Sequence, residues 1–412
     1  MKVVIIGGGI IGLTGAYYLS KEGIDVTVVD NGDITDGCSF GNMGYISPSH
    51  FIPLATPGMI KQGIKWMMSS TSPFYIKPRL SMDLIQWGLA FKKSANKNLV
   101  DRNAPLLNNL IQLSRHKINE LSEELSDFQL IEKGVFMLYK NESTGKHERE
   151  IADQANVFGL KTVVCNGQEV QDYETETEVD VAGGVLYKDD CHVNPAMLMK
   201  SLYNKLKEMD VRFLLNMEVS GFETHNGTIT AVKTHQGLIA GDEIIIANGS
   251  WMGELSKSLG IKLLMQPGKG YSMVYEGLQH NLLYPSILVD DRVATTPINQ
   301  WLRIGGTMEM SGFSQKRLPR RIIAIHDAFK KYYPGMNLPI PDTNTTWYGY
   351  RPVTPDGMPY IGRHSKYKNL IYAGGHAMLG VSTASGTGHL LAEIVRHQPT
   401  TIPIQAFMPE RF

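Results

Sequence analysis

The sequence has few cysteines for its length. Only Cys38, Cys165 and Cys191 occur among 412 residues, and long stretches separate them. Three scattered cysteines cannot build a disulfide framework, and none stands in the paired spacing of a zinc site. We therefore expect reduced cysteines in an intracellular protein, and no metal site.

An excess charge of one sign and long apolar runs are also missing. The 40 Lys and Arg residues balance the 40 Asp and Glu residues, so no net basic field favours nucleic acid as a partner. There is no run of about 18 apolar residues, which argues against a membrane-spanning helix. The first residues lack the pattern of a signal peptide, so the expected location is cytoplasmic.

One segment contains basic residues but no acidic ones. No Asp or Glu occurs between Asp36 and Asp83, and residues 59–68 are rich in apolar side chains. These basic residues are Lys61, Lys65, Lys77 and Arg79. Such a stretch is typical of a surface for lipid headgroups, or of a segment packed on the protein. Peripheral contact with the inner face of the cell membrane therefore stays open.

Glycine, in contrast, is concentrated near the start, in MKVVIIGGGIIGLTGAYYLSKEGIDVTVVD. Residues 3–6 form a short apolar run that predicts a buried parallel strand. Residues 11–20 predict a helix that ends near Gly23, and residues 25–29 predict a second strand. Strand, glycines, helix and strand in this order are typical of a dinucleotide-binding unit.

Three glycines and one acid have defined roles in such a unit. Gly7 permits the tight turn, Gly9 lets a pyrophosphate reach the backbone, and Gly12 lets the helix pack on the strand. The helix N-terminus directs its positive dipole end at the phosphates. Asp30 follows the second strand and can bind a ribose hydroxyl. The motif predicts a dinucleotide site but does not separate FAD from NAD.

Two later segments extend this prediction. Small residues recur in SFGNMG at 39–44, where a loop can wrap the phosphates. Near the C-terminus, a strand at 370–372, a glycine-rich turn and a helix at about 382–395 again aim a helix N-terminus at a ligand. A positive helix end stabilises the anionic ring of reduced flavin. This second helix therefore favours FAD.

The remaining chain is expected to mix helices and strands. Leucines and isoleucines at helical spacing predict a helix over 105–130. Asn194 and Pro195 are a cap and first residue for another helix. Residues 211–219, 228–234 and 242–249 are expected to form strands in close succession.

Four segments keep their order over nearly the whole chain: GGGIIG with Asp30, SFGNMG, ANGSW, and GYRPVTPDGMPYIG with AGGHAMLG. Together they resemble the FAD-dependent D-amino-acid oxidase superfamily, and most closely its bacterial D-amino-acid dehydrogenases. The resemblance implies a mixed α/β fold. A Rossmann-like FAD-binding domain (1–55, 190–256 and 346–412) would interleave with an antiparallel-sheet substrate domain (56–189 and 257–345).

The resemblance also implies the residues that contact FAD. FAD is expected to be non-covalent, because Cys38 does not occupy the position at which some relatives carry a covalent linkage. The implied FAD contacts are Gly7, Gly9, Gly12, Asp30, Ser39, Asn42, Gly44, Val219, Gly249, Gly375, Leu379, Gly380, Ser382 and Thr383.

For the substrate, the resemblance implies that Arg351 grips a carboxylate, which a guanidinium can do through two parallel hydrogen bonds. Tyr271, His50 and His376 are further candidate catalytic residues, and Tyr45 could line the pocket. A purely structural role is the alternative for His376. Met378 occupies a position that carries an arginine in glycine oxidase-like members, which weakens the case for glycine as substrate.

The implied reaction is oxidative deamination of a D-amino acid to a 2-oxo acid, with hydride passing from Cα to flavin N5. Proline-like substrates such as cis-4-hydroxy-D-proline are among the candidates. The electron acceptor would be a quinone or oxygen. The alternatives are a glycine or sarcosine-type amine oxidase of the same fold, and a non-catalytic FAD-binding subunit.

Overall fold

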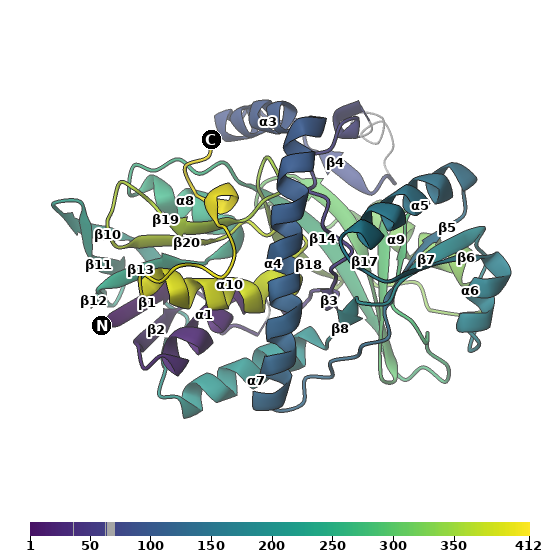
Figure 1. Ribbon diagram of the computed structural model, residues 1–412, viewed down its shortest axis with the longest axis horizontal. Helices are drawn as coiled ribbons and strands as arrows, with labels where there is room; N and C mark the ends of the chain where they lie inside the picture. The colour runs from purple at the N-terminus through teal and green to yellow at the C-terminus, as the bar shows by residue number, and fades with distance from the viewer. Residues whose placement is uncertain (36, 62, 64–70) are drawn as a thin grey trace.

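The computed structural model describes residues 1–35, 37–61, 63 and 71–412. Two large sheets organise these residues, and the long helix α4 (Lys97–Glu124) runs along one face of the molecule, in the foreground of Figure 1. The predicted mixed α/β architecture is confirmed.

The first sheet is six-stranded and mostly parallel. Its order is β19 (Tyr360–Arg363), β20 (Leu370–Gly374), β13 (Glu243–Ile246), β1 (Lys2–Ile6), β2 (Asp25–Val29) and β9 (Arg212–Leu214). Only the β19–β20 pair is antiparallel. β1, β13 and β20 are nearly all apolar and almost wholly buried, as expected of parallel strands covered on both faces.

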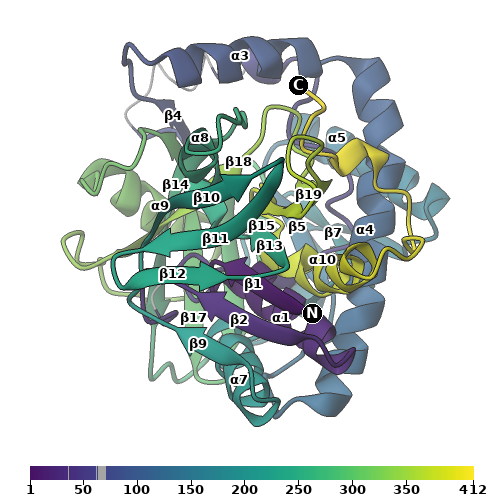
Figure 2. The ribbon, with the colours of Figure 1, turned by 90° about the vertical axis from the view of Figure 1, so that its left-hand side faces the viewer.

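Alternate residues of β1 face two different layers. Val3 and Ile5 pack toward a cluster that includes α1 (Ile10–Lys21), α7 (Pro195–Glu208) and α10 (Gly380–Val395). Val4 and Ile6 pack toward the small sheet formed by β10 (Val219–His225), β11 (Thr228–Thr234) and β12 (Gly237–Ala240). Figure 2 views the molecule from the side of this small sheet.

The second large sheet is nine-stranded and mainly antiparallel. Its order is β18 (Trp347–Val353), β14 (Gln266–Tyr275), β17 (Trp301–Met310), β16 (Val293–Ile298), β15 (Ser286–Leu288), β5 (Val135–Tyr139), β7 (Gly183–Tyr187) and β6 (Thr162–Asn166), with β4 (Phe74–Ile76) beside β17. The β15–β5 and β17–β4 pairs are parallel. β3 (Tyr45–Ile46) and β8 (Cys191–His192) form a separate pair.

The remaining helices surround the sheets. They are α3 (Met82–Ser94), α5 (Glu142–Val157), α6 (Gly167–Tyr173), α8 (Met252–Lys257) and α9 (Pro319–Tyr332), with 3-10 turns at Gly249–Trp251 and Gln405–Phe407.

Close contacts of α10 explain its small residues. A Cβ at Gly388 would lie 2.6 Å from the backbone of Thr14 on α1, and one at Gly386 would lie 2.9 Å from the backbone of Ser114 on α4. Across these contacts, Thr14 donates to the Ala384 carbonyl over 2.9 Å. The three helices therefore pack at backbone distance, which fixes the N-terminus of α10 relative to α1.

Two predicted elements differ from the structure. The helix expected at 105–130 occupies Lys97–Glu124, because Asn96 caps its start by accepting from Leu99 N over 3.0 Å. The strand expected at 211–219 is interrupted, because Asn216 adopts a left-handed conformation (φ 53°) between β9 and β10. The helix after Asn194 begins as predicted, with its cap accepting from Met197 N over 3.3 Å.

Candidate active site

A cavity of about 1160 Å³ is lined by residues of both large sheets. The ends of β1 and β2, the N-termini of α1 and α10, and the 37–47 loop contribute to one part of its wall. Strands β14, β17 and β18 contribute to another. The volume is large enough for a dinucleotide and a small substrate together.

The glycines after β1 have the geometry that their predicted roles require. Gly7 has φ 113°, and a Cβ there would lie 2.5 Å from the Ala247 carbonyl oxygen. A Cβ at Gly12 would lie 1.9 Å from the Gly7 carbonyl oxygen. Gly9 lines the cavity, and a Cβ there would meet only Ser39 Oγ, at 3.4 Å. A longer side chain at Gly9 would therefore grow into the cavity.

Asp30 and Ser39 hold the backbone of this loop. The Asp30 carboxylate accepts from Gly8 N over 2.6 Å and from Gly32 N over 2.8 Å. Ser39 Oγ accepts from Ile10 N over 2.9 Å, at the start of α1. Both residues line the cavity, so the acid stands where a ribose would meet the end of β2.

The predicted FAD contacts divide into two groups. Ten line the cavity: Gly7, Gly9, Asp30, Ser39, Asn42, Val219, Gly249, Leu379, Gly380 and Ser382. Gly12, Gly44, Gly375 and Thr383 do not line it and instead shape the backbone behind it. Gly44 (φ 81°) lies against the Val193 carbonyl oxygen, and Thr383 Oγ1 donates to the Leu379 carbonyl over 2.7 Å.

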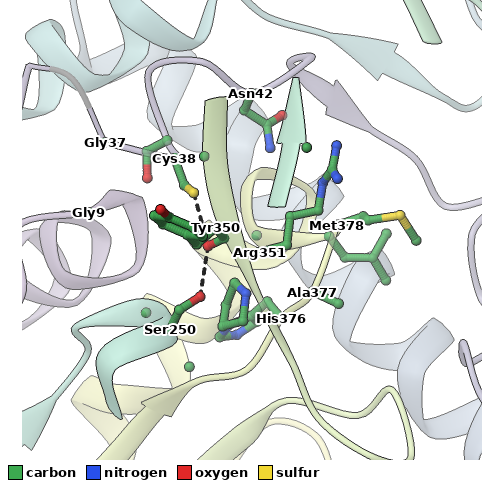
Figure 3. A pocket seen from close by; sticks show the side chains of 18 of the residues that line it. Gly9, Gly37, Cys38, Asn42, Ser250, Tyr350, Arg351, His376, Ala377 and Met378 are labelled. Carbon is green, nitrogen blue, oxygen red and sulfur yellow. Dashed lines mark hydrogen bonds between the residues drawn. The ribbon is translucent and has the colours of Figure 1, made fainter. Parts of the chain in front are cut away.

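Arg351 lies in the cavity wall on β18 (Figure 3). Its Nη1 donates to the Thr307 carbonyl over 2.6 Å, and no carboxylate of the described residues forms an ion pair with it. Burial lowers its pKa, opposed by nearby Cys38. A half-buried guanidinium without an acidic partner, on the wall of a cavity, attracts a ligand carboxylate.

The 376–378 segment runs beside Arg351. Ala377 N donates to the Pro352 carbonyl over 3.0 Å, and His376 forms a bridge to Val353. Figure 3 shows Met378, Ala377 and His376 around Arg351. Burial lowers the pKa of His376 to about 3, and its Nε2 lies 3.1 Å from Thr387 Oγ1. His376 therefore lines the cavity as a neutral ring that is also tied to α10.

The side chain of Tyr271 points away from Arg351. A Cβ at Gly270 would lie 2.1 Å from Arg351 Nη1, so the face of β14 at Gly270 is the one that Arg351 covers. Neighbouring strand residues face opposite sides, and Tyr271 packs in the core beyond the sheet. Its hydroxyl accepts from Leu318 N over 3.1 Å. Tyr271 is among the residues that line the cavity, but its hydroxyl is bonded on the other side of β14, so the sequence prediction of a catalytic phenol does not fit this orientation.

His50 lines the same cavity and is linked to a buried acid. Its Nδ1 lies 3.0 Å from Ser49 Oγ, which donates to Asp190 Oδ2 over 2.6 Å. Burial, with the charge of Arg292, lowers the pKa of His50 to about 4. The imidazole is therefore neutral at physiological pH. Tyr45 also lines the cavity, as expected, and its hydroxyl binds the carbonyls of Ser286 and Thr295.

Comparison with known proteins identifies the class of this site. Residues 2–394 match the family described as FAD dependent oxidoreductase. The chain belongs to this family. A D-amino acid dehydrogenase of Helicobacter pylori (strain ATCC 700392 / 26695) is 32% identical over 397 residues, which are 95% of this chain and 94% of that protein. One of Granulibacter bethesdensis is 30% identical over 403 residues, 96% of each.

Solved structures show the same fold in relatives of lower identity. L-proline dehydrogenase from P. horikoshii superposes with a TM-score of 0.80 at 22% identity, covering 100% of this chain and 97% of that one. Glycine oxidase from Bacillus cereus ATCC 14579 gives 0.78 at 22% identity, covering 100% and 99%. These neighbours support the fold of the FAD-dependent oxidoreductase.

The oxidoreductase has a cradle that fits FAD. The glycine loop, Asp30 and the start of α10 supply backbone donors and a ribose acceptor along one wall. Asn248 Oδ1, in the same wall, is buried without a hydrogen-bond partner among the described residues. Within that part of the chain, no cluster of three potential metal ligands occurs, and no helix is long and apolar enough to cross a membrane.

Several residues in or behind the cavity wall of the oxidoreductase carry no sequence signal. Arg292 lies in the turn between β15 and β16 with φ 55°, and it is a lone basic residue in its segment. Ser49 and Asp190 are 141 residues apart. Thr307 matters through its carbonyl oxygen, which any residue could supply. Only the folding of distant segments onto one another brings these groups together.

Proposed function

We propose that this oxidoreductase oxidises D-amino acids at Cα, giving a 2-oxo acid and ammonia after hydrolysis of the imine. The observation that carries this proposal is Arg351, a half-buried cation in the cavity wall beside the FAD cradle. Among the described residues, no acidic side chain neutralises it. An α-carboxylate matches that need in charge and in shape.

Arg351 acts by orientation. Thr307 holds one of its nitrogens, and the other N–H groups of the guanidinium remain for a carboxylate. FAD, when bound, supplies the acceptor for hydride. Fixing the carboxylate fixes the position of the Cα–H bond relative to the cradle, which lowers the entropic part of the barrier.

His50 provides a proton acceptor. The amine of an amino acid must lose a proton before an imine can form at Cα. A neutral imidazole in the cavity can accept that proton. Burial together with the charge of Arg292 lowers the pKa of His50 to about 4, which keeps the imidazole neutral and also makes it a weak base. We assign no proton transfer to Tyr271, because its hydroxyl lies beyond the sheet.

The named relatives support an amino acid as substrate and leave its side chain open. The two bacterial proteins at 30% and 32% identity are D-amino acid dehydrogenases. A structural neighbour is named for L-proline, so proline-like substrates such as cis-4-hydroxy-D-proline are the second group to test. Glycine and sarcosine follow, because another neighbour is a glycine oxidase.

We further propose peripheral contact of α3 with an anionic membrane surface, and a quinone as electron acceptor. Met82, Ile85 and Leu89 stand one helical turn apart on α3 and are exposed. Lys92 and Lys93 end the helix, and Trp87 and Phe91 of the same helix line the cavity. Of the basic stretch predicted from sequence, residues 62 and 64–70 lie outside the described residues.

Anaerobic reduction of the bound flavin tests the substrate class. Loss of the visible absorption of oxidised flavin is measured with D-amino acids, their L-enantiomers, cis-4-hydroxy-D-proline, glycine and sarcosine. We expect D-enantiomers to reduce the flavin and L-enantiomers to leave it oxidised. Reduction by glycine or sarcosine alone would favour the amine-oxidase alternative. Flavin that none of these compounds reduces would reject an amino-acid substrate. Re-oxidation by a soluble quinone and by oxygen then compares the two acceptors.

A further inference from the structure

Ser49 joins His50 to Asp190 in a buried chain of hydrogen bonds. Ser49 Oγ lies 3.0 Å from His50 Nδ1 and 2.6 Å from Asp190 Oδ2. The backbone N–H of Ser49 also donates to Asp190 Oδ1, over 3.0 Å. Ser49 and Asp190 are both almost fully buried, whereas His50 lines the cavity. The chain therefore leads from an internal carboxylate to the cavity wall.

The donors in this chain can be counted. A serine hydroxyl has one hydrogen, and an ionised carboxylate can only accept. When Asp190 is ionised, the Ser49 hydrogen goes to Asp190 Oδ2. The bond between Ser49 and His50 then needs its hydrogen from His50 Nδ1. A neutral imidazole carries one N–H, so His50 Nε2 is left as an acceptor.

The surroundings of His50 are connected with those of Arg351 through Arg292. The charge of Arg292 reaches His50 and lowers its pKa. Arg292 directly precedes Val293, and Val293 pairs with Gly306 of β17. The next residue of β17 is Thr307, whose carbonyl oxygen binds Arg351. One stretch of β16 and β17 therefore connects the surroundings of His50 with those of Arg351.

We propose that Asp190, acting through Ser49, is a positioning residue that holds His50 in the tautomer whose Nε2 accepts a proton from the substrate ammonium group. This inference rests on the proposed function. The N–H bond of the ammonium group breaks, a bond from hydrogen to Nε2 forms, and the positive charge moves to the imidazole. The hydrogen on His50 Nδ1 stays on the imidazole and remains hydrogen-bonded to Ser49 Oγ throughout. The proton leaves to solvent after the product.

The chain is sensitive to pH because its acid is buried. Burial raises the pKa of Asp190 to about 7, opposed by hydrogen bonds from Ser49 and from the Ser47 hydroxyl. A protonated Asp190 would donate to Ser49, Ser49 would donate to His50 Nδ1, and the histidine hydrogen would move to Nε2. The charge of Asp189 raises the pKa of Asp190, and the charge of Arg292 lowers that of His50. The charge of Asp190 in turn raises the pKa values of three neighbours, Tyr45, Tyr187 and Cys191.

Asp190→Asn tests the chain with almost no change of shape. The amide oxygen must face Ser49 N–H, so the amide NH₂ faces Ser49 Oγ. Ser49 then donates to His50 Nδ1, and Nε2 carries the hydrogen. With a D-amino acid that reduces the wild-type holoenzyme, we expect the reduction rate at pH 8 to fall about 10- to 100-fold. In the wild type, ionisation of Asp190 should make the reduction rate rise near pH 7, and this rise should be absent in the variant. The substrate affinity set by Arg351 and the FAD content should stay the same.

Ser49→Ala separates tautomer control from simple loss of a contact. It removes the partner of His50 Nδ1 without imposing the other tautomer, so its rate should lie between those of wild type and Asp190→Asn. A wild-type rate and pH profile in Asp190→Asn would overturn the proposal. So would a Ser49→Ala rate below that of Asp190→Asn.

Nitrogen NMR of ¹⁵N-histidine-labelled wild-type holoenzyme gives an answer that does not depend on the variants' folding or on turnover. His50→Gln identifies the His50 signals by their loss. We expect the Nδ1–H tautomer above pH 7, and an Nε2–H tautomer there would overturn the proposal. If no amino acid reduces the wild-type flavin but the tautomer is Nδ1–H, the proposed function fails while the positioning by Asp190 stands.

Discussion

The guanidinium of Arg351 on β18 donates to the carbonyl oxygen of Thr307 on β17 over 2.6 Å, reaching across β14, which lies between the two strands. This bond holds a half-buried cation at a fixed place in the cavity wall. Replacing Arg351 by Ala should lower kcat/KM for the best D-amino acid by about 100-fold or more, mainly through KM, because a buried charge-assisted pair is lost. FAD should remain bound, since the glycine loop is untouched.

Arg317→Ala is the matched control for Arg351. Arg317 also donates to a backbone carbonyl, that of Thr346, over 2.7 Å, but it does not line the cavity. We expect its KM to stay within about twofold of wild type. Steady-state kinetics and the flavin-to-protein absorbance ratio measure both variants. An unchanged KM in Arg351→Ala would remove Arg351 from carboxylate binding.

Gly9→Val tests the FAD cradle. A Cβ at Gly9 meets only Ser39 Oγ, at 3.4 Å, so a valine can enter the fold but projects into the space of the pyrophosphate. The purified variant should be colourless, with circular dichroism close to that of the wild-type apoprotein. Gly221→Ala is the control, because its Cβ would meet Ser258 at only 3.8 Å and it does not line the cavity. A fully flavin-loaded Gly9→Val protein would contradict the assignment.

The cofactor end of the site was predictable because its signals are local. An apolar run, three spaced glycines and an acid after the next strand predict β1, α1, β2 and their turn from 30 consecutive residues. Asn194 predicts a helix start in the same way, through a bond to Met197 three residues later. In these segments, sequence neighbours are also neighbours in space.

The substrate end depends on contacts that sequence spacing does not encode. Ser49 and Asp190 meet across 141 residues, and each is an ordinary polar residue in its own segment. The orientation of Tyr271 depends on which face of β14 packs on the core, and the strand contains glycines that blur its alternation. Pairing between β14 and β18 decides that face, and one residue of slip would reverse it.

The exposed apolar stripe of α3 predicts binding to lipid. Ile85 and Leu89 are 46% and 65% exposed, so replacing both by Ser should leave the fold intact. The wild-type protein should sediment with vesicles of phosphatidylglycerol and phosphatidylcholine, and less so at high salt, because Lys92 and Lys93 contribute to attraction. The double variant should stay in the supernatant.

Leu238→Ser on β12 is the control for this face. Leu238 is 57% exposed but belongs to the small three-stranded sheet, away from α3 (Figure 2). It should sediment like wild type. The prediction that α3 contacts the membrane would be wrong if the wild-type protein does not sediment with the vesicles. It would also be wrong if the double variant sediments with them as well as the wild type does.

The buried carboxyl of Asp190 should also affect stability as the pH changes. Its pKa is raised from 3.8 to about 7 by burial, so between these values the folded protein holds a proton that the unfolded chain has lost. The stabilisation from this proton is complete below about pH 4 and is lost as the pH rises through about 7. The Asp190→Asn variant lacks this pH-dependent stabilisation. The Tm of the variant minus the Tm of the wild type should therefore be about 5 °C higher at pH 8 than at pH 5.

Thermal unfolding of both holoenzymes at one scan rate measures this difference, and all other titrating groups cancel between them. Asp101→Asn is the matched control, because Asp101 is an exposed carboxylate on α4 that pairs with Lys97. Its Tm difference from wild type should be the same at both pH values. If the difference for Asp190→Asn instead stays constant or decreases with pH, Asp190 is ionised throughout the range, and the rise in rate near pH 7 must come from another group.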